Sequence, residues 1–202
     1  AVEVKLPIPG KFTVYNALNV LGMAMQMDIT LADAAAALRT AAGVKGRVEV
    51  VPTPGKDYTI LIDYAHTPDG LENVLSSGKG FCKGRLIAVF GCGGDRDPIK
   101  RPIMGKIGTD IADFSIITSD NPRTEEPGKI IEDIVKGIEP GKNNYEIIEN
   151  RPAAIRHAMD IAGKNDIIIL AGKGHETYQE INGIKHHLDE REVVAAYLEE
   201  MR

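Results

Sequence analysis

The sequence contains no tryptophan, only two cysteines and few aromatic residues, which make up 5% of the chain. Cys82 and Cys92 lack the spacing of a C-x-x-C motif, and two cysteines cannot build a disulfide framework. We therefore expect both to be small buried hydrophobic side chains. An excess of basic residues is missing too. The 24 Lys and Arg against 29 Asp and Glu give a net charge of −5, which disfavours a nucleic-acid partner.

Long hydrophobic runs are also missing. Apolar stretches such as Ile167–Ala171 are far shorter than the roughly 20 residues that a membrane-spanning helix needs. Residues 1–7 lack a basic segment followed by an apolar one, so they do not resemble a secretory signal. These features predict a cytoplasmic protein with no membrane partner, or the mature part of a processed chain.

The composition is otherwise typical of a folded domain. With 202 residues, 43% of them hydrophobic and 26% charged, the chain can form one domain, or one domain and part of another. It begins with Ala rather than Met, and Val2, Val4 and Leu6 alternate with charged residues as in a strand. This start indicates a truncated chain that begins within a sheet.

Two helical patterns follow the first residues. One extends from about Thr13 to Met27, and the other begins at Thr30, which forms a capping-box pattern with Asp33. The first helix carries an apolar stripe that we expect to be buried in a core rather than to bind a cofactor. The stripe consists of Leu18, Leu21, Met23, Met25 and Met27. The pattern changes near residue 47, where we expect a domain boundary.

From residue 47 onward, short apolar runs alternate with helical patterns. This alternation predicts an α/β fold with a mostly parallel, doubly wound sheet. Asn182-Gly183 predicts a hairpin with a type I′ turn, and a final helix is expected from about Glu190. The expected strands are 47–51, 58–63, 86–90, 114–118, 146–149 and 166–171, and the expected helices are 68–79, 102–112, 127–137 and 152–163.

Polar turns follow four of these strands, at ends that a parallel sheet places along one edge. They are Asp63–Pro68, Gly91–Asp97, Ser119–Arg123 and Ala171–Glu176. We therefore expect a ligand crevice there, which favours an enzyme or a small-ligand binder over a structural module. The chain contains neither G-x-x-x-x-G-K-[ST] nor G-x-G-x-x-G, so both common phosphate-binding loops are missing from it.

Two of the turns carry side chains suited to an amino-acid ligand. We interpret Arg96 as a fork for a carboxylate, with its geometry fixed by Asp95 and Asp97, rather than as a solvated charge. The acid, amide and guanidinium of Asp120–Arg123 suit a zwitterion, and the alternative is an Asx-turn that leads into a helix.

The histidines are weaker signals. His66 and His175 each follow a strand, but a lone histidine more often satisfies local hydrogen bonds than acts as a base, and no third group completes a metal site with either. Direct acid–base catalysis by one of them is the less favoured alternative. We expect His186 and His187 to lie on the surface.

The order and number of these motifs resemble the C-terminal part of a Mur ligase, within the branch of that family that adds meso-diaminopimelate. The resemblance implies a Rossmann-like C-terminal domain at residues 48–202 that binds the acceptor amino acid. Residues 1–47, a strand and two helices, would be the truncated end of the central ATP-binding domain. The motifs are Pro9–Asn16, Gly46-Arg47, Asp63–Pro68, Gly91–Asp97 with Lys100–Pro102, Asp120–Arg123, Gly172–Glu176 and Asp189–Val193.

The resemblance also implies a reaction. Mur ligases use ATP and Mg²⁺ to phosphorylate the terminal carboxylate of UDP-N-acetylmuramoyl-L-alanyl-D-glutamate in peptidoglycan synthesis. The amine of meso-diaminopimelate then attacks the acyl phosphate. The P-loop and the magnesium ligands would lie upstream of residue 1, so this chain should hold no metal ligand and should be inactive alone. We expect it to be a monomer.

Two sets of site residues follow from the resemblance. The nucleotide set is Asn16, Asn19, Arg47, Asp63 and His66, of which only His66 is also a candidate for catalysis. The meso-diaminopimelate set is Arg96, Asp120, Asn121, Pro122, Arg123, Gly172 and Glu176. The arginines would pair with carboxylates and the acids with an ammonium group. Arg123 is the discriminating residue, because lysine-adding relatives lack it and lysine has no distal carboxylate.

Other functions remain open at this point. A related ligase could add lysine or another amino acid, as folylpolyglutamate-type relatives do. A detached domain could be a non-catalytic module that binds an amino acid or a nucleotide. A dinucleotide-dependent oxidoreductase follows from the fold alone, and the glycine pattern disfavours it.

Overall fold

A computed structural model describes residues 1–6, 10–41 and 43–201. A six-stranded sheet has the order β1-β2-β6-β3-β4-β5, with β1 antiparallel to β2 and all other neighbours parallel. This arrangement confirms the mostly parallel sheet, and every strand lies close to its expected position. The strands are β1 (Glu49–Val51), β2 (Thr59–Asp63), β3 (Leu86–Phe90), β4 (Phe114–Ile117), β5 (Tyr145–Ile147) and β6 (Ile167–Ala171).

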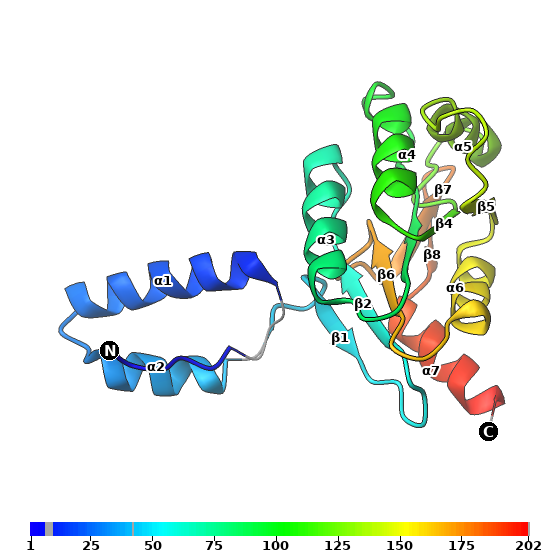
Figure 1. Ribbon diagram of the computed structural model, residues 1–202. Coiled ribbons are helices and arrows are strands. Elements are labelled where there is room, and N and C mark those ends of the chain that lie inside the picture. Colours follow the sequence, from blue (N-terminus) through cyan, green and yellow to red (C-terminus); the bar gives the residue numbers. More distant parts are fainter. Residues whose placement is uncertain (7–9, 42, 202) are drawn as a thin grey trace.

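Helices cover both faces of the sheet, as the doubly wound fold requires (Figure 1). Three of them, α3 (Pro68–Phe81), α4 (Lys100–Ile111) and α5 (Pro127–Val135), pack on one face, and α6 (Arg151–Ile161) and α7 (Glu190–Glu200) pack on the other. Proline occupies the first turn of α3, α5 and α6, where its missing N–H costs nothing.

Two hydrophobic cores result from the alternation of side chains along the buried strands. In β6, Ile169 points into the core beneath α3, α4 and α5, whereas Ile168 and Leu170 point into the core beneath α6 and α7. All residues of β3 and β6 are buried. Strands buried on both faces have continuous apolar sequences, which is why the two five-residue runs predicted central strands.

The N-terminal helices α1 (Lys11–Gln26) and α2 (Leu31–Arg39) form a hairpin that projects from the side of the sheet nearest β1 (Figure 1). The Thr30 side chain accepts a hydrogen bond from the backbone N–H of Asp33 at 3.1 Å, which confirms the predicted cap.

The prediction that the apolar stripe of α1 is buried is wrong for four of its five members. Leu21 is 9% exposed, but Leu18 is 58% exposed and Met23 is 68% exposed. Met25 and Met27 are exposed as well. The period of the stripe specifies a helix with an apolar face, but a second layer is needed to cover that face, and α2 covers only part of it.

The predicted strand at Val2–Leu6 is not observed. Residues 1–6 have no regular secondary structure. A strand requires a neighbouring strand for its backbone hydrogen bonds, and the hairpin beside this segment offers two helices instead. Pro9, at the start of one of the motifs, lies outside the described residues.

A two-stranded sheet, β7 (Tyr178–Ile181) and β8 (Ile184–His187), forms the predicted hairpin. Asn182 and Gly183 both have positive φ angles, 49° and 76°, as a type I′ turn demands. His186 and His187 are exposed as expected, and His187 lies 2.6 Å from the Glu192 carboxylate.

Of the two cysteines, Cys92 is buried, and burial raises the pKa of its thiol to about 12. Cys82 is half-buried against the core beneath α3. Neither is in a disulfide. Within the described ranges, none of the helices is both long enough and apolar enough to cross a membrane.

Candidate functional site

The polar turns predicted to converge at the carboxyl ends of the strands do so. The backbone N–H of Gly172, after β6, donates to the carbonyl of Asp63, at the end of β2, at 3.0 Å. A Cβ atom on Gly91, after β3, would lie 2.0 Å from the carbonyl oxygen of Thr118, after β4. A Cβ atom on Gly172 would lie 2.6 Å from Asp120 Oδ2. Such close approaches explain why glycine occupies these turns.

Hydrogen bonds hold the turn Asp120–Arg123 in place at this edge. Asp120 and Asn121 are buried. Asn121 Nδ2 donates to Glu176 Oε2 at 2.9 Å, and Asn121 Oδ1 accepts hydrogen bonds from Lys173 Nζ at 3.0 Å and from the Glu180 backbone N–H at 2.9 Å. These partners fix the orientation of the amide. Asp120 Oδ2 is buried and has no hydrogen-bond partner among the described residues.

Arg123 joins this turn to the hairpin. Its φ angle is 53°, its backbone N–H donates to the Glu180 carbonyl at 3.0 Å, and its Nε lies 3.4 Å from Glu180 Oε2. Its NH1 group donates to the Gly94 carbonyl at 2.8 Å. A Cβ atom on Gly93 would lie 2.9 Å from Arg123 NH1 and 3.9 Å from Arg96 Cγ. The two arginines therefore lie against the same glycine.

The environment of Arg96 differs from the prediction. Neither Asp95 nor Asp97 pairs with its guanidinium, which is exposed and donates to the Asp95 backbone carbonyl at 2.9 Å. Asp95 instead accepts hydrogen bonds from the backbone and hydroxyl of Thr124, and Asp97 accepts one from the Ile99 backbone N–H. The acids shape the loop because carboxylates are efficient acceptors for free backbone N–H groups in a turn, and the arginine stays free for a ligand.

Two fully buried cations beneath the turn were not anticipated as site residues. Lys173 Nζ lies 3.3 Å from Glu176 Oε2. Arg151 Nε lies 2.8 Å from Glu190 Oε1, and Arg151 NH1 lies 3.9 Å from Asp120 Oδ2. Arg151 occupies the first turn of α6, where the helix dipole makes a cation unfavourable. A basic residue at the start of a predicted helix was therefore the one sequence signal that could have indicated a special role for Arg151.

The formal charges of this buried cluster are unequal. Asp120, Glu176 and Glu190 are acidic, and Lys173 and Arg151 are basic, which leaves an excess of one negative charge. A buried cluster of this kind favours a cationic ligand. The Arg96 and Arg123 guanidinium groups, on the Gly93 side, favour an anionic one.

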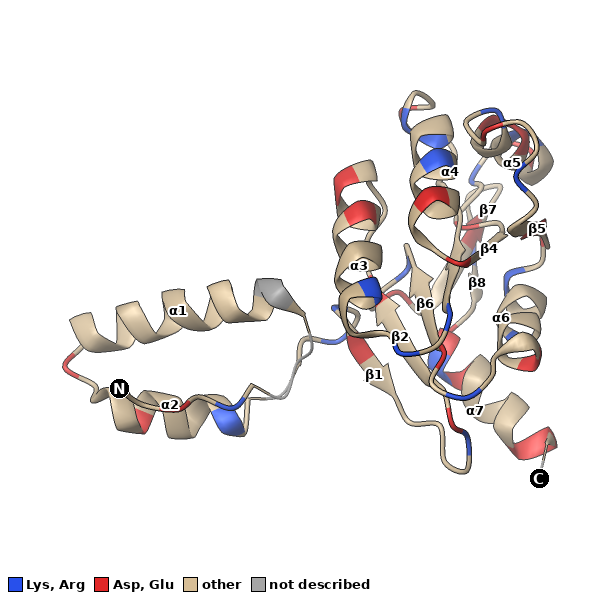
Figure 2. Ribbon diagram, in the orientation of Figure 1, with Lys and Arg blue, Asp and Glu red and all other residues tan. Residues whose placement is uncertain are grey.

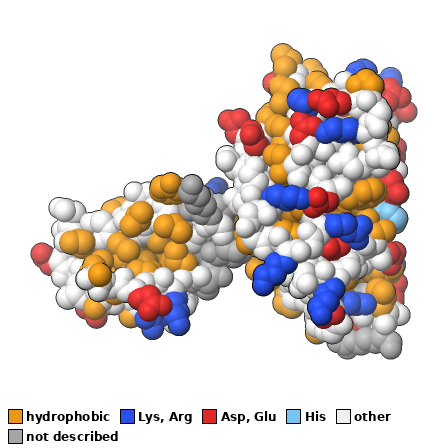
Figure 3. Space-filling view, viewed as in Figure 1, with side chains coloured by type: hydrophobic (Ala, Val, Ile, Leu, Met, Phe, Trp, Pro, Cys, Tyr) orange, Lys and Arg blue, Asp and Glu red, His pale blue; other side chains and the backbone are white. Residues whose placement is uncertain are grey.

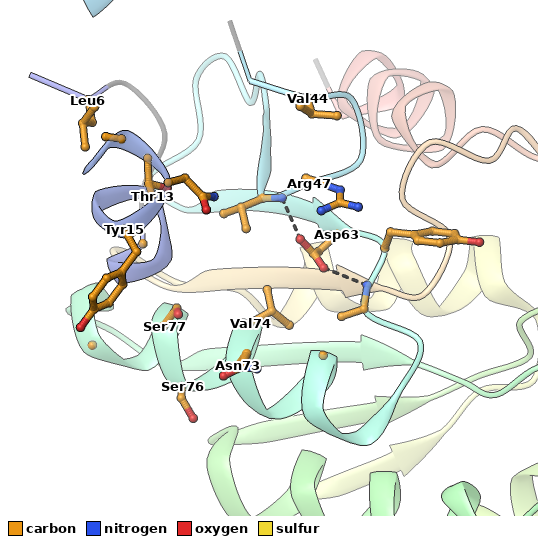
Figure 4. Close-up of a pocket in the computed structure, with 18 of the residues that line it drawn as sticks. Leu6, Thr13, Tyr15, Val44, Arg47, Asp63, Asn73, Val74, Ser76 and Ser77 are labelled. Atoms are coloured by element: carbon orange, nitrogen blue, oxygen red, sulfur yellow. Dashed lines mark hydrogen bonds between the residues drawn. The ribbon is translucent and has the colours of Figure 1, made fainter. Parts of the chain in front are cut away.

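A cavity of about 1,120 Å³ lies between the α1–α2 hairpin and α3 (Figure 4). Its lining includes Arg47 and Val48, in the segment that joins the hairpin to the sheet and is called the junction below. The cavity exceeds the upper end of the usual volume range for small-molecule sites. Asn16, Arg47, Asp63 and His66 line it, so it brings together four of the five predicted nucleotide residues. Asn19 is exposed on α1 and is not among the residues that line it.

Asp63 is partly committed to backbone contacts at the cavity wall. Its carboxylate accepts hydrogen bonds from the backbone N–H groups of Val48 and Ala65, both at 2.8 Å, as Figure 4 shows with dashed lines. Burial raises the pKa of Asp63, although these hydrogen bonds and the charge of Arg47 oppose the shift. Val48 has a φ angle of 43°, which a β-branched residue rarely adopts, so the junction is strained there.

An aromatic cluster lies between the cavity and the Asp120–Arg123 turn. The Tyr64 ring lies 4.7 Å from the His66 ring and 5.1 Å from the His175 ring. His66 Nδ1 is 2.8 Å from the Tyr64 carbonyl, so one nitrogen of the catalytic candidate already has a local partner. No described group of three His, Cys, Asp or Glu residues could hold a metal ion.

A second ionic group lies within the sheet domain, next to the segment that joins the hairpin to the sheet. Arg191, in the first turn of α7, contacts both carboxylate oxygens of Glu49, at 2.8 and 2.5 Å, and donates to the Gly174 carbonyl at 3.0 Å. Gly46 has a φ angle of 76°, and a Cβ atom there would lie 2.2 Å from the backbone nitrogen of His175. The turn after β6 is thus held directly against the junction.

Comparison with known proteins identifies the family. Residues 46–174 match the model for the glutamate ligase domain of Mur ligases. The chain belongs to the Mur ligase family. It is 51% identical over 199 residues to UDP-N-acetylmuramoyl-L-alanyl-D-glutamate–2,6-diaminopimelate ligase of Clostridium botulinum, a match that covers 98% of this chain and 41% of the relative. The enzyme of the same name from Bacillus cereus is 50% identical over 193 residues, covering 96% and 39%.

Solved structures give the same result for this Mur ligase chain. A structure of UDP-N-acetylmuramoyl-L-alanyl-D-glutamate–2,6-diaminopimelate ligase matches with a TM-score of 0.78 and 39% identity, over 98% of this chain and 40% of the other. A UDP-N-acetylmuramate–alanine ligase from Thermotoga maritima shares the fold, with a TM-score of 0.68 and 22% identity over 100% and 40% of the two chains. The chain thus spans about 40% of the length of these relatives.

Proposed function

We propose that this Mur ligase chain carries the acceptor amino-acid site of an ATP-dependent ligase. That ligase joins meso-diaminopimelate to UDP-N-acetylmuramoyl-L-alanyl-D-glutamate in peptidoglycan synthesis. The observation that carries the proposal is the pairing of opposite charges around one turn. Asp120 and Glu176 provide negative charge at the beginning of the Asp120–Arg123 turn. Arg123, at the end of that turn, and Arg96 provide positive charge beside Gly93. The names of the similar proteins agree with it.

The geometry suits meso-diaminopimelate because each end of that molecule has both an ammonium and a carboxylate group. The excess negative charge of the buried cluster would receive an ammonium, and the free guanidinium of Arg96 would receive a carboxylate with Arg123. Asn121 and Gly172 would shape the site between them, and Pro122 would hold the turn. Lysine has one carboxylate fewer and would leave one guanidinium unpaired.

The nucleotide would occupy the cavity between the hairpin and α3. Asn16, Arg47, Asp63 and His66 offer it an amide, a guanidinium, a carboxylate and an imidazole, a mixture of hydrogen-bond donors and acceptors that fits the ribose hydroxyls and phosphates of ATP. ATP supplies the phosphoryl group that makes a carboxylate electrophilic enough for attack by an amine. Magnesium would be held mainly by parts of a full-length ligase that this chain does not contain. The chain's own acidic turn would bind the acceptor and orient its amine.

Residues 1–47 would belong to the ATP-binding domain of the full-length enzyme, and 48–202 would be the acceptor domain. Support comes from the exposed apolar face of α1, which needs a further layer to cover it. We further propose a monomer that acts in the cytoplasm, the compartment that supplies ATP.

Calorimetric titration of meso-diaminopimelate, and separately of lysine, tests the acceptor site. We expect the chain to bind meso-diaminopimelate and not lysine, and Arg123→Ala to weaken binding by about 1.5–3 kcal/mol, as for a lost charge-assisted hydrogen bond. Arg156→Ala is a matched control, since Arg156, in the middle of α6, pairs with Glu200 at the end of α7 and not with any residue of the proposed site. Equal affinity for lysine would instead assign the chain to a lysine-adding ligase.

A second measurement tests the ligase against a non-catalytic module. The chain contains no G-x-x-x-x-G-K-[ST] motif, so we expect no ATP turnover by the chain alone. ATP hydrolysis that purifies with the chain would contradict this expectation. A binding module would also fail to restore amide synthesis when combined with the remaining part of a Mur ligase.

A further inference from the structure

Lys173 is buried in a way that rules out direct contact with a ligand. Its side chain has no exposed surface. It lies between Gly172 and Gly174, whose φ angles of 115° and 52° turn the chain so that the lysine points inward beneath the loop. Lysine is almost never fully buried unless it is paired, because its charge loses hydration there. This lysine therefore serves the groups around it.

The partners of Lys173 are two of the proposed acceptor-site residues. Its Nζ donates to Asn121 Oδ1 at 3.0 Å and lies 3.3 Å from Glu176 Oε2. Asn121 Nδ2 donates to the same Glu176 oxygen at 2.9 Å. The three side chains form a closed triangle in which each contacts the other two. The Tyr178 ring, 5.6 Å from Nζ, covers the ammonium.

The triangle leaves specific atoms for a ligand. Glu176 Oε2 is used twice, whereas Glu176 Oε1 accepts no hydrogen bond from any described residue. Because Asn121 Oδ1 faces Lys173, the amide cannot flip without placing N–H groups against the ammonium. Asn121 Nδ2 donates one N–H to Glu176 Oε2 and keeps a second N–H that no described residue accepts. An acceptor and a donor next to each other match an ammonium and a neighbouring carboxylate.

Electrostatics agrees with this geometry. Burial lowers the pKa of Lys173, against the opposing effect of the negative charge of Asp120. Arg151, the other buried cation, is bound to Glu190 and to the Ala171 carbonyl, so it does not replace Lys173 at Glu176. Without Lys173, the buried cluster would carry one more uncompensated negative charge, and the Asn121 amide would lose its orientation.

We propose that Lys173 is a positioning residue of the acceptor site. It orients the Asn121 amide and fixes Glu176 so that Glu176 Oε1 faces the ammonium group of the acceptor amino acid. This inference rests on the proposed function for the identity of the ligand, but the positioning itself exists in the free protein.

A double-mutant cycle in meso-diaminopimelate binding tests the proposal. Lys173→Met keeps the length and apolar stem of the side chain and removes the charge. We expect it to raise the Kd about tenfold or more. Glu176→Gln is expected to raise the Kd by a similar factor. The Kd of the double variant should be no higher than that of the single variant with the higher Kd, because Lys173 acts through Glu176. Effects that multiply would overturn the proposal. Lys164→Met, at an exposed lysine, is the control and should leave the Kd unchanged.

A ligand-free measurement separates this inference from the substrate assignment. In the wild type, NMR should show Asn121 side-chain amide protons that exchange slowly with solvent. Lys173→Met should abolish that protection, and Lys164→Met should preserve it. Unchanged Asn121 signals in folded Lys173→Met would overturn the positioning role. If the signals respond but meso-diaminopimelate does not bind the wild type, the positioning role stands and the proposed substrate fails.

If Lys173→Met does not fold, the wild type and Glu176→Gln are sufficient. The Glu176 side chain is 15% exposed, so its change to glutamine is milder. The ¹⁵N-labelled Lys173 ammonium should be visible in the wild type because burial slows its exchange. Its resonance should shift in Glu176→Gln. A resonance that does not shift would contradict the contact on which the proposal depends.

Discussion

The sheet domain and the α1–α2 hairpin both contain regular patterns of apolar residues, but they bury those residues to different extents. In the domain, the side chains of β3 and β6 are covered by helices on both faces. In the hairpin, hydrophobic side chains remain on the surface, as the face shown in Figure 3 makes visible. Figure 2 shows that charged residues are frequent on the domain, whereas the hairpin has few. Periodicity therefore specifies a helix and its apolar face, whereas burial of that face depends on a second element that packs against it.

The largest expected difference between the two regions lies in the cost of removing a large apolar side chain. Phe90 is fully buried in β3 and packs against Gly108 of α4. Phe90→Ala should lower the free energy of unfolding by about 3–5 kcal/mol, because it leaves a cavity. Met23→Ala, on the exposed face of α1, should change it by less than about 0.5 kcal/mol. Urea denaturation measures both. A large loss from Met23→Ala would mean that the hairpin face is covered in solution.

A smaller effect is expected at the junction that joins the regions. In Gly46→Ala the new Cβ atom would meet the backbone of Gly174 and His175, at a positive φ angle. Gly55 is a matched control, since its φ angle of 78° is nearly the same and nothing lies within 4 Å of its Cβ position. We expect Gly46→Ala to be destabilising by about 1–3 kcal/mol more than Gly55→Ala in thermal melts. Equal losses would show that the close approach does not matter.

The smallest expected effect is the pH dependence of the same junction. The hydrogen bonds from Arg191 lower the pKa of Glu49 below its ordinary value of 4.5, although burial opposes the shift. The ion pair therefore contributes stability above that ordinary value and loses it as the pH falls through the lowered pKa of the folded state. We expect Glu49→Gln to lower stability by about 1 kcal/mol at neutral pH.

The same variant supplies its own control. Acidification should reduce the difference in the free energy of unfolding between wild type and Glu49→Gln, because a protonated glutamic acid also lacks the charge that Arg191 binds. Melting curves measured from neutral pH down to the acid range would show the change. A gap that stays constant over that range would exclude the ion pair as the source of the effect.

The sequence predicted most of the domain correctly because its signals are local. Fully apolar runs such as Leu86–Phe90 specify buried strands, and Asn182-Gly183 specifies a turn through its backbone preferences. The convergence of the polar turns followed from the parallel topology alone. The residue roles assigned through family resemblance stay predictions, and so do the boundaries of the two domains.

What the sequence could not show depends on contacts between distant residues. The sequence predicted that the turns holding Asn121 and Lys173 converge, but not that these two side chains would form a hydrogen bond. Arg151 meets Glu190 only after α6 and α7 pack together. The two acids beside Arg96 suggested a local ion pair, but each accepts a hydrogen bond from a backbone N–H group instead. The strand expected at Val2–Leu6 had the right alternation and no neighbour to pair with.

The position of β6 has a consequence for synthesis on the ribosome. β6 lies between β2 and β3 in the sheet, so Thr59 and Leu86 both pair with Ile167. Residues 49–147 therefore emerge with a gap at the centre of the sheet and two apolar strand edges unpaired. Such edges are prone to aggregate until they are covered, and pairing between distant segments is slow. The two halves of the sheet therefore cannot complete their pairing until β6, the last parallel strand, has left the exit tunnel.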